Sequence, residues 1–208
     1  MTDDTELKAI VLNCTLNPSP TESSSQKLAQ QLLDELASYS IGGSIERLAD
    51  YSIAPGVEKD MGQGDHWPHI RQKILDADIL IIATPTWMGH MSSIAQGALE
   101  RLDAELSETD DEGRLLTHGK VAAAVVVGNE DGAHAIHADL FQGLNDVGFT
   151  IPAGAGVYWN GEAMHATDYK DLKETPEKVA SLLKSAASSI AHLATLLKAN
   201  QYPAPSGS

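Results

Sequence analysis

An unbroken apolar run is the feature that most constrains how this 208-residue chain can fold. Residues 79–83 are all apolar, without the alternation of a half-exposed strand, which is typical of a central parallel strand covered on both faces. Pro85 and Gly89 mark a turn directly after this run, and Ser92 or Ser93 can cap a following helix. Open α/β sheets bind ligands beyond the carboxyl ends of their strands, so we expect a site at this turn.

Two other apolar strands end in loops that suit a ligand. The first leads into the hydroxyl-rich loop 15–25, after which a helix is expected to begin near Ser24. The N–H groups of a helix N-terminus, together with hydroxyl groups, can bind a dianion without Lys or Arg. The alternative is an ordinary N-cap with a flexible loop. The second strand, residues 121–128, runs into the loop 128–134. The first loop lacks GxGxxG, which argues against a Rossmann dinucleotide site. The chain also lacks GxxxxGK[ST], which argues against a P-loop.

Alternating strand and helix patterns predict the architecture. Five strands alternating with five helices favour a doubly wound α/β fold, a three-layer sandwich around a five-stranded parallel sheet of order 2-1-3-4-5. The fifth strand is expected to begin at residues 149–151 as an edge or interrupted strand, because Pro152 follows. Residues 153–169 are interpreted as a pocket wall or subunit contact, or alternatively as a satellite cluster under a long loop. This order brings the three loops to one crevice, with phosphate at the first and a flat ring beside Trp87.

Composition excludes several classes of protein and of partner. The formal net charge of −15 makes nucleic acid and anionic membrane surfaces poor candidates for partners. No run approaches the length of a membrane span and the N-terminus lacks a signal pattern, so we expect a cytoplasmic protein. The single cysteine, Cys14, rules out an internal disulfide and is interpreted as a small buried hydrophobe. We expect residues 7–199 to form one domain, with a flexible lead at 1–6 and a disordered tail at 200–208.

The three loops together carry a family resemblance. The loop 15–25, the turn Thr-Pro-Thr-Trp-Met-Gly at 84–89 and the Gly-Asn-Glu-Asp-Gly-Ala sequence at 128–133 stand in the order expected for the ends of strands 1, 3 and 4. In these features the chain resembles a flavodoxin-like NAD(P)H-dependent FMN reductase over roughly residues 8–197. It departs from the family in the first loop, where Thr-Leu-Asn stands in place of a Ser-x-Arg beginning.

The resemblance implies FMN as the cofactor and NADH or NADPH as the co-substrate. It also implies backbone N–H groups on the polar edge of the flavin and Trp87 on or beside the ring. Carried over by position, the first loop would hold the phosphate and the second and third loops the isoalloxazine. The implied cofactor-binding residues are Thr15, Asn17, Ser23, Ser24 and Ser25 for the phosphate, and Pro85, Thr86, Trp87, Met88, Gly89, Gly128, Asn129, Glu130, Asp131 and Gly132 for the ring.

No catalytic side chain is obligatory, because in such an enzyme the flavin N5 accepts the hydride. His134 and His90 are the histidines nearest the expected flavin, and ordinary capping or surface roles are the alternative for both. His134 and His137, or His66 and His69, have a spacing that metal ligands use, but no third ligand presents itself, so we expect no metal site.

The resulting hypothesis is an FMN-dependent oxidoreductase. It would pass hydride from NAD(P)H through bound flavin to a quinone, free flavin or another small acceptor. A flavodoxin-like electron carrier and a flavin-free binding protein on the same fold are the alternatives, the latter suggested by the missing arginine. The resemblance to this fold family also implies a homodimer or homotetramer.

Overall fold

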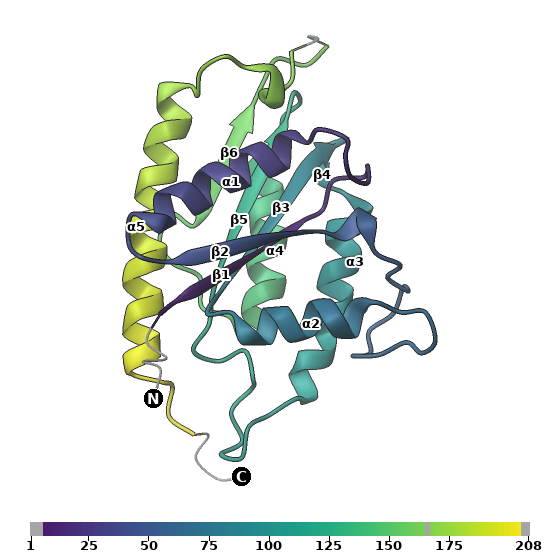
Figure 1. The fold of residues 1–208 in the computed structure, drawn as a ribbon, viewed down its shortest axis with the longest axis vertical. Helices are drawn as coiled ribbons and strands as arrows, with labels where there is room; N and C mark the ends of the chain where they lie inside the picture. Colours follow the sequence, from purple (N-terminus) through teal and green to yellow (C-terminus); the bar gives the residue numbers. More distant parts are fainter. Residues whose placement is uncertain (1–5, 165–166, 205–208) are drawn as a thin grey trace.

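The centre of the molecule is one parallel sheet. The computed structural model describes residues 6–164 and 167–204. In this part of the chain the path β2-β1-β3-β5-β6 forms the sheet (Figure 1), which confirms the predicted order of five parallel strands. A short strand, β4, pairs antiparallel with the end of β3. The strands are β1 (Lys8–Asn13), β2 (Gly42–Arg47), β3 (Ile79–Trp87), β4 (His90–Met91), β5 (Val121–Gly128) and β6 (Gly156–Asn160).

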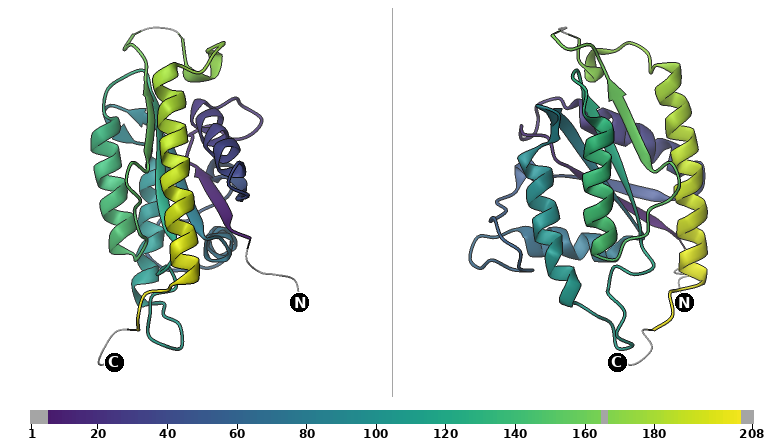
Figure 2. Two further views of the ribbon diagram at one scale, coloured as in Figure 1. Left: turned by 90° about the vertical axis from the view of Figure 1, so that its left-hand side faces the viewer. Right: turned by 180° about the vertical axis from the view of Figure 1, so that it is seen from behind.

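Helices cover both faces of this sheet (Figure 2), so the three-layer sandwich is also confirmed. Ile79 and Ile81 of β3 belong to the core beneath α1 and α5, whereas Leu80 and Ile82 belong to the core beneath α2, α3 and α4. Burial on both faces explains the unbroken apolar run. The helices are α1 (Ser24–Ala37), α2 (Trp67–Asp76), α3 (Ser93–Leu102), α4 (Ala133–Asp146) and α5 (Glu177–Ala199), with 3₁₀ turns η1 (Leu48–Asp50), η2 (Asp103–Ser107) and η3 (Tyr169–Asp171).

Serine caps begin two helices that follow the carboxyl ends of strands β1 and β3. The hydroxyl of Ser23 accepts the N–H of Gln26 at the start of α1, and that of Ser92 accepts the N–H of Ala95 at the start of α3. These caps satisfy N–H groups that have no partner within the helix. Both helices therefore begin where the sequence predicts, each directly after a loop from the sheet.

The fifth strand lies later than its predicted start. Thr150 forms only an isolated bridge with Val121, and the strand proper is β6. Pro152 has no N–H for pairing and Gly154 takes a positive φ of 70°, so the chain leaves the sheet and returns. The stretch 153–169, interpreted from the sequence as a pocket wall, a subunit contact or a satellite cluster, thus contains a strand.

The turn after the central strand also lies later than expected. β3 continues through Pro85, which is in register with Val127, as far as Trp87. The reversal occurs at Met88 and Gly89, whose φ angles are 51° and 77°.

By length and composition α5 could cross a membrane, contrary to the expectation that no run approaches a span, but its apolar residues pack against the sheet and α1. In the predicted tail, the hydroxyl of Tyr202 lies 2.9 Å from Thr150 Oγ1 and its ring 5.6 Å from that of His118. Residues 1–5 and 205–208, parts of the predicted lead and tail, lie outside the described residues.

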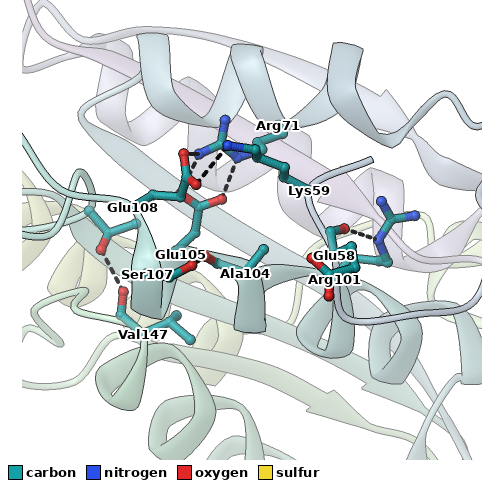
Figure 3. Close-up of polar contacts among 10 residues, drawn as sticks. Glu58, Lys59, Arg71, Arg101, Ala104, Glu105, Ser107, Glu108 and Val147 are labelled. Atoms are coloured by element: carbon teal, nitrogen blue, oxygen red, sulfur yellow. Dashed lines mark hydrogen bonds and ion pairs between the residues drawn. The ribbon is translucent and has the colours of Figure 1, made fainter. Parts of the chain in front are cut away.

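A buried ion pair fixes the long connection between η1 and α2. The side chains of Arg101 and Asp65, each 1% exposed, meet at 2.8 Å. Arg101 also donates to the carbonyl oxygens of Glu58 (Figure 3) and Ala54, and lies over the ring of Trp67. Burial alone would raise the pKa of Asp65, but hydrogen bonds from Arg101 and from backbone N–H groups hold that pKa well below its usual range.

We expect Arg101→Met to destabilise the protein by about 3 kcal/mol or more, because it leaves the Asp65 carboxylate buried without its partner. Urea unfolding followed by circular dichroism measures this loss. Arg114→Met, which breaks the more exposed pair with Asp110, is the control and should leave the midpoint close to that of the wild type. Equal midpoints for the two variants would contradict the assignment.

Candidate functional site

A cavity of about 520 Å³ lies at the carboxyl ends of β1, β3 and β5, where the sequence places a ligand. Each of the three predicted loops contributes to its wall. The predicted cofactor residues that line it are Thr15, Asn17, Ser23, Ser24, Ser25, Pro85, Thr86, Trp87, Gly128, Asn129 and Glu130; Met88, Gly89, Asp131 and Gly132 do not.

The three serines of the first loop have different hydrogen-bond partners. Ser25, 2% exposed, donates to Asn13 Oδ1 and therefore accepts the hydroxyl proton of Ser23, 3.0 Å away. The protons of Ser23 and Ser25 are thus both engaged inside the protein. Ser24 instead accepts the backbone N–H of Lys170 at 3.1 Å, which leaves its own proton available to a ligand. Of the three, Ser24 is the best placed to donate to an anion at the N-terminus of α1.

The turn after β3 packs tightly against the loop after β5. A Cβ atom at Gly132, which has a φ of 141°, would lie 2.7 Å from the carbonyl oxygen of Gly89, so a glycine is needed there. The N–H of Met88 donates to Glu130 Oε1 at 2.5 Å, and the N–H of Gly132 donates to Asp131 Oδ1 at 2.7 Å. Carboxylates of the chain therefore occupy two backbone donors that the sequence analysis assigned to a flavin ring.

Two buried polar atoms belong to cavity-lining residues and have no hydrogen-bond partner within the described chain. These are Thr86 Oγ1 and Asn129 Oδ1. Thr86 has its place because Gly128 lacks a side chain: a Cβ there would lie 2.6 Å from the Cβ of Thr86. A buried polar group without a partner costs free energy, and the heteroatoms of a flat polar ring can supply such a partner. The cavity therefore fits FMN by its chemistry, with the Ser24 hydroxyl at the N-terminus of α1 and the unpaired oxygens of Thr86 and Asn129 in the wall formed by β3 and the loop after β5.

β6 and the segment after it complete the wall. The interpretation of 153–169 as a pocket wall is confirmed for the residues of this stretch that line the cavity, and Lys170 lines it as well; the former are Trp159, Ala163, Met164, Asp168 and Tyr169. The aromatic content of this stretch was the signal in the sequence. Nothing in the sequence marked Lys170, because it reaches the cavity only through the packing of η3 against α1.

The predicted histidines lie outside the cavity wall. His90 is exposed on β4, and the ring of His134 lies 5.0 Å from that of Tyr158 on the surface of α4. Within the described residues no group of three His, Cys, Asp or Glu side chains is placed to hold a metal ion, and the absence of a metal stays a prediction. Of the spaced pair His134 and His137, only His137 is buried. Its ring stacks on Phe141, and its Nε2 has no hydrogen-bond partner in the described chain.

His137 should make stability depend on pH. Burial, and then the nearby His134, lower the pKa of His137 from 6.5 to about 4. Between these values the unfolded chain binds a proton that the native state does not, so stability is complete above pH 6.5 and falls as pH falls toward 4. Urea unfolding across this range should show a loss of up to about 3 kcal/mol from His137 in the wild type, and a much smaller loss in His137→Gln. His134→Gln is the control and should keep most of the loss; the same slope in His137→Gln as in wild type would contradict the assignment.

Comparison with known proteins agrees with this geometry. The family model of NADPH-dependent FMN reductase matches residues 7–164. Among curated proteins, 8-demethyl-8-aminoriboflavin-5'-phosphate synthase of Streptomyces davaonensis is 30% identical over 206 residues, covering 94% of this chain and 80% of the relative. The divalent metal cation transporter MntH of Mycobacterium bovis is 32% identical over 169 residues; the match covers 79% of this chain but spans only 25% of that relative.

Comparison with solved structures also finds flavin-related proteins. The crystal structure of RosB with bound 8-demethyl-8-formylriboflavin-5'-phosphate has a TM-score of 0.85 at 30% identity, covering 94% of this chain and 82% of RosB. The NAD(P)H:acceptor oxidoreductase FerB of Paracoccus denitrificans has a TM-score of 0.60 at 18% identity, covering 94% and 100%, and supports the fold alone. The family match confirms the expectation of FMN and NAD(P)H, and the chain belongs to the NADPH-dependent FMN reductase family.

Proposed function

We propose that this chain passes hydride from NAD(P)H, through FMN bound in the 520 Å³ cavity, to a quinone, free flavin or another small acceptor. The proposal rests on one observation: the same cavity has hydrogen-bond donors at one end and unpaired buried polar atoms in another part of its wall. Hydroxyl and N–H donors lie at the N-terminus of α1, and unpaired buried polar atoms belong to Thr86 and Asn129, which line the same cavity as Trp87. Such a cavity matches a ligand with an anionic tail and a flat polar ring.

The residues of the chain bind and orient rather than react. Ser24 and the first N–H groups of α1 would hold the phosphate, and Trp87 would contact the ring. Thr86 and Asn129 would bond polar atoms of the ring, which would satisfy the two unpaired oxygens. When bound, FMN supplies the hydride-accepting N5, so no acid or base of the protein is obligatory.

The colour of the protein tests the proposal. After addition of FMN and gel filtration we expect a yellow protein with absorbance at about 450 nm, bleached rapidly by anaerobic NADPH or NADH. A yellow protein that neither nucleotide bleaches would support the alternative, an electron carrier. A colourless protein that binds no added FMN would overturn the proposal.

Trp87→Ala tests the placement of the ring. Trp87 is 55% exposed, so its loss should leave the unfolding midpoint unchanged while weakening FMN binding by about tenfold through lost ring contact. Quenching of flavin fluorescence measures the affinity. Tyr39→Ala removes an aromatic ring of similar exposure (47%) away from the cavity and is the matched control. An unchanged FMN affinity in Trp87→Ala would count against a role for Trp87 in ring packing.

A second candidate function is favoured by the relatives at 30% identity. One is a synthase of a modified riboflavin-5'-phosphate, and RosB binds another such derivative. In this alternative the same cavity would hold riboflavin-5'-phosphate as substrate. Mass spectrometry of the flavin recovered after prolonged turnover distinguishes the two: an unchanged mass supports the reductase, and a changed mass supports flavin modification.

Assembly and location remain proposals. We propose a homodimer or homotetramer in the cytoplasm, without a nucleic-acid or membrane partner, as the charge and the family suggest. Light scattering coupled to size-exclusion chromatography measures the oligomeric state.

A further inference from the structure

Basic residues gather at one end of a strongly acidic protein. The loop 15–25 contains no Lys or Arg, and the formal net charge is −15. Nevertheless Lys27, Arg47 and Lys170 line a hollow of about 560 Å³ at the N-terminal end of α1. This hollow and the ligand cavity share four residues: Thr21, Glu22, Ser23 and Lys170.

Two of these cations, Lys27 and Arg47, use their N–H groups in hydrogen bonds within the protein. Lys27 Nζ donates to the carbonyl oxygens of Tyr169, Lys170 and Leu172 at 3.0–3.3 Å, which uses the three protons of an ammonium group. Arg47, 8% exposed, donates to the carbonyl oxygen of Thr21 and to Gln26 Oε1. Both therefore position the loop and η3.

Lys170 has weaker and more exposed partners. Its ammonium lies 2.8 Å from Asp171 and 3.7 Å from Asp168, carboxylates that are 46% and 50% exposed. Such surface pairs contribute little to stability, so the ammonium can leave them to bind an anion, and its charge offsets the carboxylates of Glu22 and Asp168 that also line the cavity. Lys170 lines the cavity. Its backbone is fixed against the first turn of α1, because Lys170 N–H donates to Ser24 Oγ.

We propose that Lys170 binds the 5'-phosphate of the flavin, supplying from η3 the cation that the first loop lacks. On this assignment the ammonium of Lys170 and the hydroxyl proton of Ser24 bind the same phosphate, and the hydrogen bond from Lys170 N–H to Ser24 Oγ holds the two residues together. Lys170 is then the residue that selects phosphorylated flavin over riboflavin. The inference rests on the proposed function, since it requires FMN in this cavity.

The experiment compares two flavins that differ only in the phosphate. Kd values for FMN and riboflavin are measured by fluorescence quenching with wild type, Lys170→Ala, Lys170→Arg and Lys173→Ala. We expect Lys170→Ala to weaken FMN binding about tenfold or more, the usual effect of losing a charge-assisted hydrogen bond, while riboflavin affinity stays within about twofold. The salt dependence of FMN binding should also become shallower, because one cation fewer faces the phosphate. Lys170→Arg should retain most of the affinity.

Lys173→Ala is the matched control, because Lys173 is an exposed lysine three residues further on that lines neither hollow. Thermal unfolding of each variant checks that the fold is intact. FMN and riboflavin weakened equally, or FMN binding unchanged, in Lys170→Ala would overturn the role of Lys170 while the proposed function stands. Failure of the wild type to bind FMN would overturn both.

Discussion

A buried hydroxyl, that of Ser92, holds together the segments on which the ligand cavity depends. It donates to the carbonyl oxygen of Cys14 at 2.7 Å and accepts the N–H of Ala95, while the backbone N–H of Ser92 donates to Thr84 Oγ1. Cys14 N–H in turn donates to the carbonyl oxygen of Ala83 at 2.7 Å. Leaving one of these buried groups without a partner would cost about 1–3 kcal/mol. The ends of β1 and β3 and the start of α3 are therefore fixed relative to one another by the protein alone.

On this frame the two ends of the cavity differ in their charged groups: Lys170 lines the end at α1 together with Glu22 and Asp168, and Glu130 lines the other. Lys27 and Arg47 support the N-terminus of α1, which itself carries partial positive charge. At the other end the Glu130 carboxylate holds the N–H of Met88.

Most of the fold could be predicted because it depends on local patterns. The apolar runs of β3 and β5, the serine before α3 and the amphipathic face of α1 each reflect burial or capping within a few residues. The position of β6 could not be predicted in this way, because Pro152 interrupts the apolar pattern and pairing with β5 resumes only at Gly156. Likewise, Pro85 predicts a turn from the sequence, but in the structure it is still part of β3 and pairs in register with Val127 of β5.

The sequence by itself determined the class of fold, the order of the strands and the three loops that meet at the site, since these follow from periodicity and from the handedness of the connections. Only the tertiary structure decided which atoms of those loops face a ligand. The protons of Ser23 and Ser25 are engaged within the protein and that of Ser24 is not, because Asn13 and the N–H of Lys170 approach them from other elements. Hydrogen bonds between residues far apart in the chain leave no periodic signal, and so the candidate phosphate ligands became distinguishable only once α1 and η3 were packed together.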